Sequence, residues 1–342
     1  MMERKDVPVL ELRNVGMTFT KALGLFTRPL QIQALKDVSM GVFPGEVLTV
    51  VGESGGGKTT VGNILAGITR PTSGSILFNA KDIGSMNKAD YREYRRQVQI
   101  VQQDVYSALN PAHTVAYSLS TPMLTMKRVA NRKEAVKRVD ELLQLVELRP
   151  VGQYLGKYPH QLSGGQRQRI LLARAISLEP RVIIADEPVS MIDVSLRVSA
   201  LNLMRKLNRE MGISFLYITH DLATARYIGQ NGRIAVLYLG LVVETGGLSE
   251  VIANPRHPYL QALLSAVPVP DPEISRIRKK VRLANVDMPS ITAPPPGCRF
   301  HTRCPYAEEL CKRTEPELRP VGSSIVACHF AEKIPAWSLG PG

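Results

Sequence analysis

The stretch VLTVVGESGGGKTT, residues 47–60, decides the fold of this chain. Its first five residues are apolar or β-branched and predict a buried strand, and the glycines that follow predict a tight turn. The motif comprises Gly52, four intervening residues, Gly57, Lys58 and Thr59. This spacing fits a phosphate-binding loop, in which backbone N–H groups surround a phosphate, the lysine neutralises the β- and γ-phosphates and the threonine hydroxyl is offered to Mg²⁺. The expected nucleotide contacts are Gly52, Ser54, Gly55, Gly57, Lys58, Thr59 and Thr60, with a helix from Thr60 onward.

A second apolar run ends in two carboxylates. Residues 181–187 read RVIIADE, so a buried strand is expected to end at Asp186 and Glu187. Asp186 suits the coordination shell of Mg²⁺, and Glu187 is placed to polarise a water molecule for attack on the γ-phosphate. Alone, such a run also fits a strand that meets solvent. Together with the phosphate-binding loop, it predicts a nucleotide hydrolase.

The string LSGGQ, residues 162–166, precedes a helical stretch. Ser163 is suited to cap that helix, and the two glycines leave its first amides open to an anion. Helix capping alone also explains the Ser-Gly-Gly part. The full string, followed by Arg167-Gln168-Arg169, is much more specific.

At this string the chain resembles the ATP-binding cassette (ABC) ATPases, whose family signature is Leu-Ser-Gly-Gly-Gln. The resemblance covers roughly residues 9–255. It implies an α/β P-loop NTPase cassette with a mixed sheet core and an inserted helical subdomain, with ATP and Mg²⁺ as cofactors. It also implies that Gln103 senses Mg²⁺ and water in the Q-loop, that His220 is the switch histidine at the γ-phosphate, and that Asp193 belongs to the D-loop.

In this family two cassettes enclose two ATP molecules, each between the phosphate-binding loop of one subunit and the signature of the other. The resemblance therefore implies a second ABC ATPase subunit, whose bound ATP is contacted by Ser163, Gly165 and Gln166 of this chain. Phe19 matches the aromatic residue that stacks on adenine. Phe26 competes for that role, and core packing explains Phe19 equally well.

Length and charge narrow the class of protein without deciding it. The chain has 342 residues, with 43 Lys and Arg against 30 Asp and Glu, so the formal charge is 43 − 30 = +13. Apolar and charged contents of 44% and 21% are typical of a globular chain and exclude global disorder. No signal peptide is expected at residues 1–8, and the longest apolar run, 234–243, is too short for a membrane helix. We therefore expect a soluble intracellular protein, while the positive excess fits nucleotide phosphates, nucleic acid, anionic lipid or merely a soluble surface.

The pattern of apolar runs predicts an α/β fold with an appendage. Strands are expected at residues 9–12, 33–39, 47–51, 75–78, 182–185 and 215–218. Helical spacing in between predicts an inserted helical subdomain at about 105–165. Prolines punctuate the chain after residue 255, and all four Cys lie beyond them, so a linker and a small module outside the sheet are expected. The predicted domains are residues 1–254, a nucleotide-binding domain, and residues 255–342, a Cys-containing tail.

Motifs in the tail narrow the resemblance to one branch of the family. HPY at 257–259, LLSAVPVPDP at 263–272 and GCRFHTRCP at 297–305 look like the oligopeptide/dipeptide branch of ABC importer ATPases, and more like its F-type than its D-type subunit. That branch implies a D-type partner in a heterodimer, two transmembrane permease subunits and an extracellular solute-binding protein. It places the chain peripherally on the cytoplasmic face of the cell membrane, driving uptake of peptides or, in some relatives, nickel or oligosaccharides.

Four cysteines lie within the tail, at Cys298, Cys304, Cys311 and Cys328. In a chain without a secretion signal, four thiols this close favour a metal centre over disulfides. The spacing lacks the Cys-x₂-Cys pairs usual for zinc ribbons. Four Cys also suit a [4Fe–4S] cluster, which the resemblance of the tail implies. Zinc, free thiols and disulfides stay open, and His301 and His329 are candidate substitute ligands.

Two other functions are compatible with part of the sequence. A soluble ABC ATPase that acts on nucleic acid or ribosomes fits the basic charge. The single cassette, the absence of a coiled-coil insertion and the importer-type tail speak against it, so no nucleic acid is expected as a partner. A regulatory subunit with a dead site is disfavoured, because Lys58, Asp186, Glu187 and His220 are all present.

Overall fold

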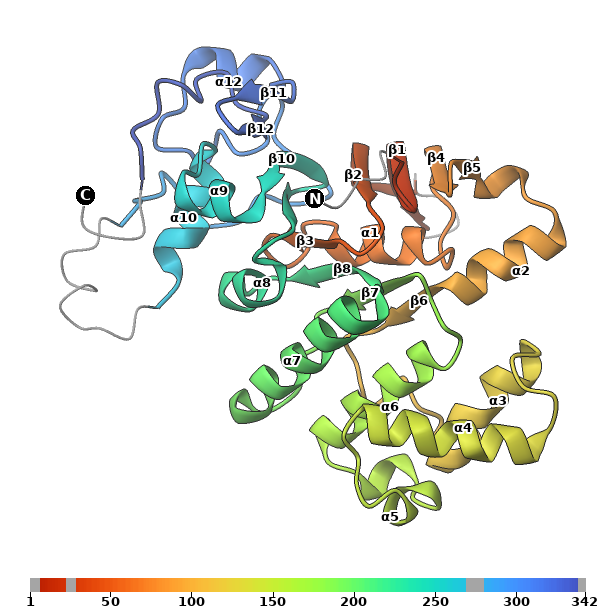
Figure 1. Ribbon diagram of the computed structural model, residues 1–342. Coiled ribbons are helices and arrows are strands. Elements are labelled where there is room, and N and C mark those ends of the chain that lie inside the picture. The colour runs from red at the N-terminus through yellow and green to blue at the C-terminus, as the bar shows by residue number, and fades with distance from the viewer. Residues whose placement is uncertain (1–6, 23–28, 269–279, 338–342) are drawn as a thin grey trace.

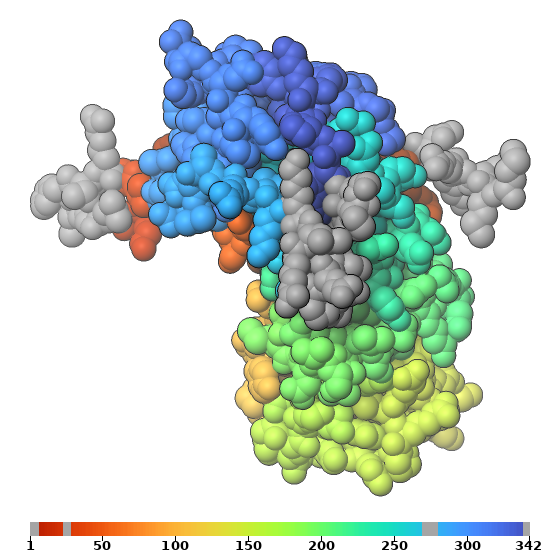
Figure 2. Space-filling model, turned by 90° about the vertical axis from the view of Figure 1, so that its left-hand side faces the viewer, coloured from red at the N-terminus to blue at the C-terminus, as the bar shows by residue number. Residues whose placement is uncertain are grey.

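The computed structural model describes residues 7–22, 29–268 and 280–337. Phe26 lies outside these described residues. A small N-terminal sheet and a larger central sheet lie next to each other, with a group of helices at one end of the molecule (Figure 1). Figure 2 shows that the tail, in blue, covers the opposite end from these helices, in yellow and green.

The N-terminal sheet is antiparallel and has the strand order β2-β1-β4-β5. Its strands are β1 (Leu10–Lys21), β2 (Leu30–Val42), β4 (Ser73–Phe78) and β5 (Lys81–Asp82). The long strand β1 pairs with β2 along its length, which sets Phe19 opposite Ile32. Both strands run past the predicted segments 9–12 and 33–39, because polar and apolar residues continue to alternate across a sheet with one buried face.

The central sheet is mixed, with strand order β11-β12-β10-β9-β3-β8-β7-β6. Its strands are β3 (Val47–Val51), β6 (Val98–Val101), β7 (Val182–Asp186), β8 (Ser214–Thr219), β9 (Arg233–Tyr238), β10 (Leu241–Gly247), β11 (Arg319–Val321) and β12 (Ser324–Val326). The five strands from β9 to β6 are parallel. Every residue of β3, β7 and β8 is buried, as expected of parallel strands covered on both faces.

Helix α1 (Lys58–Leu65) lies between the two sheets and contacts strands of both. Its buried residues Val61, Ile64 and Leu65 join one core with the inner faces of β1, β3 and β8. The remaining helices of this part are α2 (Lys88–Gln97), α7 (Val194–Met211), α8 (Leu222–Gly229) and α9 (Leu248–Ala253), with a 3₁₀ turn at Ile83–Ser85. None of the described helices combines the length and apolar character needed to cross a bilayer.

The helical insert forms a second core. It contains α3 (Val115–Thr125), α4 (Arg132–Leu145), α5 (Gly152–Leu155), a 3₁₀ turn at Pro159–Gln161 and then α6 (Gly164–Ile176). The apolar face of α4, Ala135, Val139, Leu142 and Leu143, is buried against α3 and α6. These helices cover most of the expected subdomain at about 105–165, but α6 continues to Ile176, eleven residues past the expected end.

The tail does not stand apart from the sheet, so that expectation is wrong. Strand β12 pairs antiparallel with β10, and β11 pairs with β12, so a tail hairpin extends the central sheet by two strands. The reason is that β10 would otherwise leave its backbone N–H and C=O groups unpaired at an edge. Helices α10 (Pro258–Ala266) and α12 (Glu309–Arg313) complete the tail. Tyr259, Phe300 and Trp337 share a core with strand β9, so the tail packs on the cassette.

Candidate active site

The phosphate-binding loop joins the end of β3 to the start of α1, as its sequence predicts. Its glycines are required by geometry. Gly52 has φ +158°, and a Cβ there would lie 2.2 Å from the Leu237 carbonyl oxygen. Gly57 has φ +99°, in the left-handed region, and a Cβ would lie 2.7 Å from the Ala34 carbonyl oxygen. The backbone therefore turns in a space that side chains cannot enter.

Lys58 is buried at the start of α1, with 5% of its surface exposed. Its Nζ donates hydrogen bonds to the carbonyl oxygens of Gly52, at 2.8 Å, and Glu53, at 2.9 Å. Burial lowers the pKa of Lys58, and the carboxylates of Glu187 and Asp186 oppose that shift. The ammonium is thus held inside the loop, where a phosphate would replace carbonyl oxygens as its partner.

Asp186 is the last residue of β7 and is 4% exposed. Its Oδ1 is buried and has no hydrogen-bond partner among the described residues. Burial raises its pKa, and the neighbouring Thr59 hydroxyl opposes the rise. A buried carboxylate oxygen without a partner, beside a threonine hydroxyl, fits the oxygen ligands that Mg²⁺ prefers.

Glu187 follows β7 and is held by two other side chains. Its Oε1 lies 2.9 Å from His220 Nδ1, and its Oε2 accepts a hydrogen bond from Gln103 Nε2 at 3.1 Å. Glu187 has φ +44°, and its N–H donates to the Ile218 carbonyl oxygen at the end of β8. This left-handed conformation is uncommon for a non-glycine residue. The carboxylate of Glu187 is thereby held between Gln103 and His220, two residues that the family resemblance implied in the nucleotide site.

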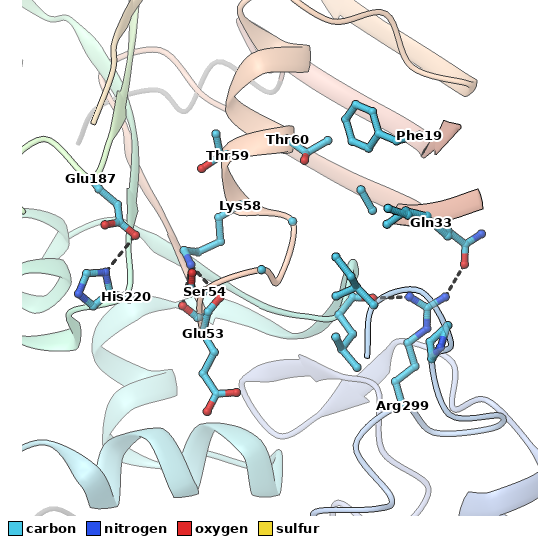
Figure 3. A pocket seen from close by; sticks show the side chains of 18 of the residues that line it. Phe19, Gln33, Glu53, Ser54, Lys58, Thr59, Thr60, Glu187, His220 and Arg299 are labelled. Atoms are coloured by element: carbon cyan, nitrogen blue, oxygen red, sulfur yellow. Dashed lines mark hydrogen bonds and ion pairs between the residues drawn. The ribbon is translucent and has the colours of Figure 1, made fainter. Parts of the chain in front are cut away.

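The loop residues, Glu187, Gln103 and His220 line one cavity of about 780 Å³, whereas the buried Asp186 is not part of its lining. Glu187 and His220 lie at one end, Lys58 in the middle and Phe19 at the other end (Figure 3). The lining includes the predicted residues Phe19, Gly52, Ser54, Gly55, Gly57, Lys58, Thr59, Thr60, Gln103, Glu187 and His220. The Phe19 side chain is 43% exposed, so Phe19 is not a core residue.

The signature residues Ser163, Gly165 and Gln166 do not line this cavity, and neither does Asp193. Ser163 and Gln166 form a capping box at the start of α6, in which each side chain bonds the backbone N–H of the other. A Cβ on Gly165 would lie 2.9 Å from Leu196, so the signature packs against the start of α7. The signature residues are predicted to contact ATP bound to a neighbouring subunit. Their position away from this chain's own cavity is compatible with that prediction.

The sequence did not reveal that the tail also contributes to the cavity. Leu263, Ile291, Pro294 and Arg299 line its end near Phe19. Arg299 is 6% exposed and donates hydrogen bonds to the Leu239 carbonyl oxygen and to Gln33 Oε1 (Figure 3). The only available signal was the arginine itself, which lies next to Cys298 in a segment that motif reasoning assigned to the cysteines.

The four tail cysteines are free thiols that line one small cavity, together with His301 and His329. Burial raises the pKa of Cys298 and of Cys304 to about 12. His301 Nδ1 lies 2.9 Å from the Cys298 carbonyl oxygen, and His329 Nε2 lies 2.9 Å from the Thr314 carbonyl oxygen. Across residues 7–22, 29–268 and 280–337, no group of three or more His, Cys, Asp or Glu side chains is arranged to hold a metal ion.

The cavity built by the cassette supports hydrolysis of a nucleoside triphosphate, which places the protein in the class of P-loop NTPases. Comparison with known families agrees. The ABC transporter family profile matches residues 35–190, and the profile of the oligopeptide/dipeptide transporter C-terminal region matches residues 243–311.

Curated relatives match along nearly the whole chain. The oligopeptide transport ATP-binding protein AppF of Bacillus subtilis is 43% identical, with 94% of this chain and 97% of the relative covered. OppF of Salmonella typhimurium, also an oligopeptide transport ATP-binding protein, is 42% identical, with 96% and 97% covered. The di/tripeptide transport ATP-binding protein DppF of Pseudomonas aeruginosa is 40% identical, with 95% and 98% covered.

Solved structures agree with the fold. The ATP-binding cassette MJ0796, a dimer bound to ADP and Pi, aligns with a TM-score of 0.61 and 31% identity, covering 70% of this chain and 98% of that one. The chain therefore belongs to the ABC transporter family, in the oligopeptide/dipeptide branch of its ATP-binding subunits. It is an ATPase.

Proposed function

We propose that this chain is the ATP-hydrolysing subunit of an importer of oligopeptides or dipeptides. The observation that carries the proposal is the presence in one chain of two features. The first is the site in which Glu187 meets Gln103 and His220, and the second is a tail that matches the C-terminal region of oligopeptide/dipeptide transporters. The curated relatives are named for oligopeptides and for di- and tripeptides. No observation favours nucleic acid as the partner.

In the proposed reaction, Glu187 is the general base. Its carboxylate accepts a proton from water while the water oxygen bonds to the γ-phosphorus and the bond to the ADP oxygen breaks. His220 donates a hydrogen bond to the γ-phosphate, and Gln103 orients the water. The contacts of Glu187 with both residues support this assignment, because they hold the carboxylate at the γ-phosphate end of the cavity.

The remaining loop residues bind the phosphates. Lys58 and the amides of Gly55 and Gly57 neutralise and orient them. Thr59, Asp186 and Gln103 would hold Mg²⁺, supported by the unpartnered buried oxygen of Asp186. When bound, Mg²⁺ would neutralise charge on the phosphates. Phe19, exposed at the far end of the cavity, stacks on adenine.

The signature is proposed to act in a facing subunit. Ser163, Gly165, Gln166 and Asp193 lie away from this chain's own cavity, next to exposed apolar residues that a partner would cover. Those exposed residues are Met191, Val194, Leu196 and Val198. The solved cassette MJ0796 is itself described as a dimer. We propose a D-type ABC ATPase as the second subunit here.

Because no described helix spans a membrane, the path for the solute belongs to other chains. Two transmembrane permease subunits and an extracellular solute-binding protein complete the proposed importer. The chain would bind peripherally on the cytoplasmic face of the membrane.

For the tail cysteines we propose a [4Fe–4S] cluster rather than Zn²⁺. Its support is that Cys298, Cys304, Cys311 and Cys328 line the same small cavity as free thiols. Iron and acid-labile sulfide assays on anaerobically prepared protein test this proposal. We expect both elements in the wild type and neither after Cys311→Ala; zinc alone, or no metal, would refute it.

Reconstitution tests the function as a whole. The chain is purified with its permease subunits and binding protein, placed in proteoliposomes, and supplied with ATP and labelled dipeptide, longer peptide, nickel or oligosaccharide. We expect uptake of peptide. Uptake of nickel or oligosaccharide without peptide would refute the solute class. Salt-sensitive nucleic-acid binding by a chain that copurifies with no membrane subunit would refute transport itself.

A further inference from the structure

The Cys-bearing tail touches the phosphate-binding loop directly. Arg303, in the segment between Cys298 and Cys304, is 4% exposed. Its guanidinium donates two hydrogen bonds to the Glu53 carboxylate, at 2.6 Å and 2.9 Å. Paired bonds of this kind between a guanidinium and a carboxylate are charge-assisted and fix both groups in position. The two residues are 250 positions apart in the sequence.

Glu53 is the second residue of the phosphate-binding loop. Besides the Gly56 N–H, which donates to the Glu53 carbonyl oxygen at 3.2 Å within the loop, three groups hold it. Its carboxylate meets Arg303, its N–H donates to the Tyr259 hydroxyl at 2.7 Å, and its carbonyl oxygen accepts from Lys58 at 2.9 Å. Figure 3 shows the Glu53 side chain pointing away from Lys58. Two of these three contacts come from the tail, since Tyr259 belongs to α10.

The burial of Arg303 makes the contact specific. Its guanidinium carbon lies 5.8 Å from the ring centres of both Tyr238 and Phe300, in a core shared by cassette and tail. An arginine in such surroundings is costly to bury unless a carboxylate pairs with it. Glu53 is therefore the partner that fixes where Arg303 lies, and Arg303 in turn fixes Glu53.

A contact of this kind can order the phosphate-binding loop, because the loop has few side chains of its own to fix its conformation. Residues 55–57 are three consecutive glycines, which have no side chains to anchor the loop and which lose much conformational freedom when they become ordered. An external contact at Glu53 limits the conformations of the empty loop, so that less entropy is lost when phosphates bind.

We propose that Arg303 is a positioning residue that, through Glu53, holds the phosphate-binding loop in its phosphate-accepting conformation, so that the Cys-bearing tail sets part of the affinity for nucleotide. The proposal rests on the proposed function of the loop as the phosphate site. It assigns to the tail a role in the ATP site itself.

The test is ADP binding by the full-length chain, measured by calorimetry with Arg303→Gln, Glu53→Gln and the double variant. Each single change is expected to weaken ADP binding about tenfold, by loss of a charge-assisted pair. The double variant should be no weaker than either single variant, because the two residues act as one unit. The matched control is Arg319→Gln, which breaks the exposed tail ion pair with Glu332 and should leave ADP affinity unchanged.

Turnover separates positioning from general loss of structure. In the assembled importer the KM for ATP should rise about tenfold in Arg303→Gln with kcat nearly unchanged, because the loop holds phosphates alike in ground and transition states. A lower melting temperature with unchanged ADP affinity would overturn the proposal. If Arg303→Gln does not fold, Glu53→Gln, changed at a side chain with 31% exposure, decides the same question.

Lys58→Ala distinguishes this proposal from the function on which it rests. If Lys58→Ala leaves ADP affinity intact, the loop is not the phosphate site and the proposed function fails. If Lys58→Ala weakens ADP binding and Arg303→Gln does not, only the role of Arg303 is refuted.

Discussion

The two ends of the nucleotide cavity are built in different ways. At the γ-phosphate end, Glu187, Gln103 and His220 follow three neighbouring parallel strands of the central sheet, β7, β6 and β8. At the end near Phe19, the wall combines the N-terminal sheet with Ile291 and other tail residues. One end is made by strand ends of a single sheet, and the other by segments far apart in the sequence.

This difference separates two kinds of effect. In the proposed mechanism, residues at the γ-phosphate end act on the reacting atoms, so changes there should lower turnover with little effect on affinity. Residues at the far end contact parts of the nucleotide that do not react, so changes there should weaken binding in ground and transition states alike. Glu187, at the γ-phosphate end, and Ile291, at the far end, are the residues whose substitution tests this difference most directly.

The largest effect is expected for Glu187→Gln. The amide cannot accept the proton from water, so kcat for ATP should fall by about 10³-fold, while ATP binding persists. Phosphate release by the assembled importer measures the loss, and retention of bound ATP is measured in parallel. Turnover near the wild-type rate would show that Glu187 is not the base.

Lys58→Ala is expected to weaken affinity for ADP by about 100-fold, since it removes a buried cation from the phosphates. Calorimetric titration of the whole chain with ADP measures it. Lys280→Ala, which changes an exposed lysine in the tail, is the control. Equal affinities for the two variants would contradict the assigned role of the loop.

A third prediction concerns the junction of cassette and tail. Glu244, on β10, is fully buried and accepts hydrogen bonds from the N–H groups of Arg256 and His257. Burial raises its pKa from 4.5 to about 7. The folded chain therefore keeps a proton that the unfolded chain releases, so this carboxyl lowers the free energy of unfolding as pH rises from about 4.5 to about 7.

Glu244→Gln should remove that dependence. The difference in free energy of unfolding between variant and wild type should grow with pH over this range, by on the order of 2 kcal/mol. Urea titrations at several pH values measure it. A difference that does not change with pH would show that Glu244 does not titrate in this range.

The smallest effect is expected at the far end of the cavity. Ile291→Ala removes apolar wall from the tail side and should weaken ATP and ADP binding about threefold with kcat unchanged. Val286→Ala, at an exposed position of the same segment that does not line the cavity, is the matched control. A fall in kcat for Ile291→Ala would break the distinction between the two ends.

The γ-phosphate end was predictable because its chemistry is local. Lys58 and Glu187 each follow a buried strand at a position that the motif fixes, and parallel strands bring their carboxyl ends to one edge. The glycine requirement at Gly52 and Gly57 follows from the same motif. These positions needed no knowledge of distant contacts.

The far end was not predictable, because long-range contacts decide it. Arg299, at this end, and Arg303, beside the phosphate-binding loop, lie within GCRFHTRCP, a motif that carries the resemblance but assigns no role to its arginines. Their partners Gln33 and Glu53 lie more than 200 residues earlier in the chain. The pairing of β12 with β10 was missed for a second reason. Strand β12 has three residues, 324–326, which are too few to indicate a strand by periodicity. The prolines around the tail suggested separation where the structure has a shared core.

The central claim is that this cavity hydrolyses ATP to drive peptide import. Its most direct measurement is the rate of phosphate release by the assembled importer with and without peptide-loaded binding protein. We expect that peptide-loaded binding protein raises the rate, and that Glu187→Gln abolishes the rise. A rate that peptide leaves unchanged, or a rise that survives Glu187→Gln, would contradict it.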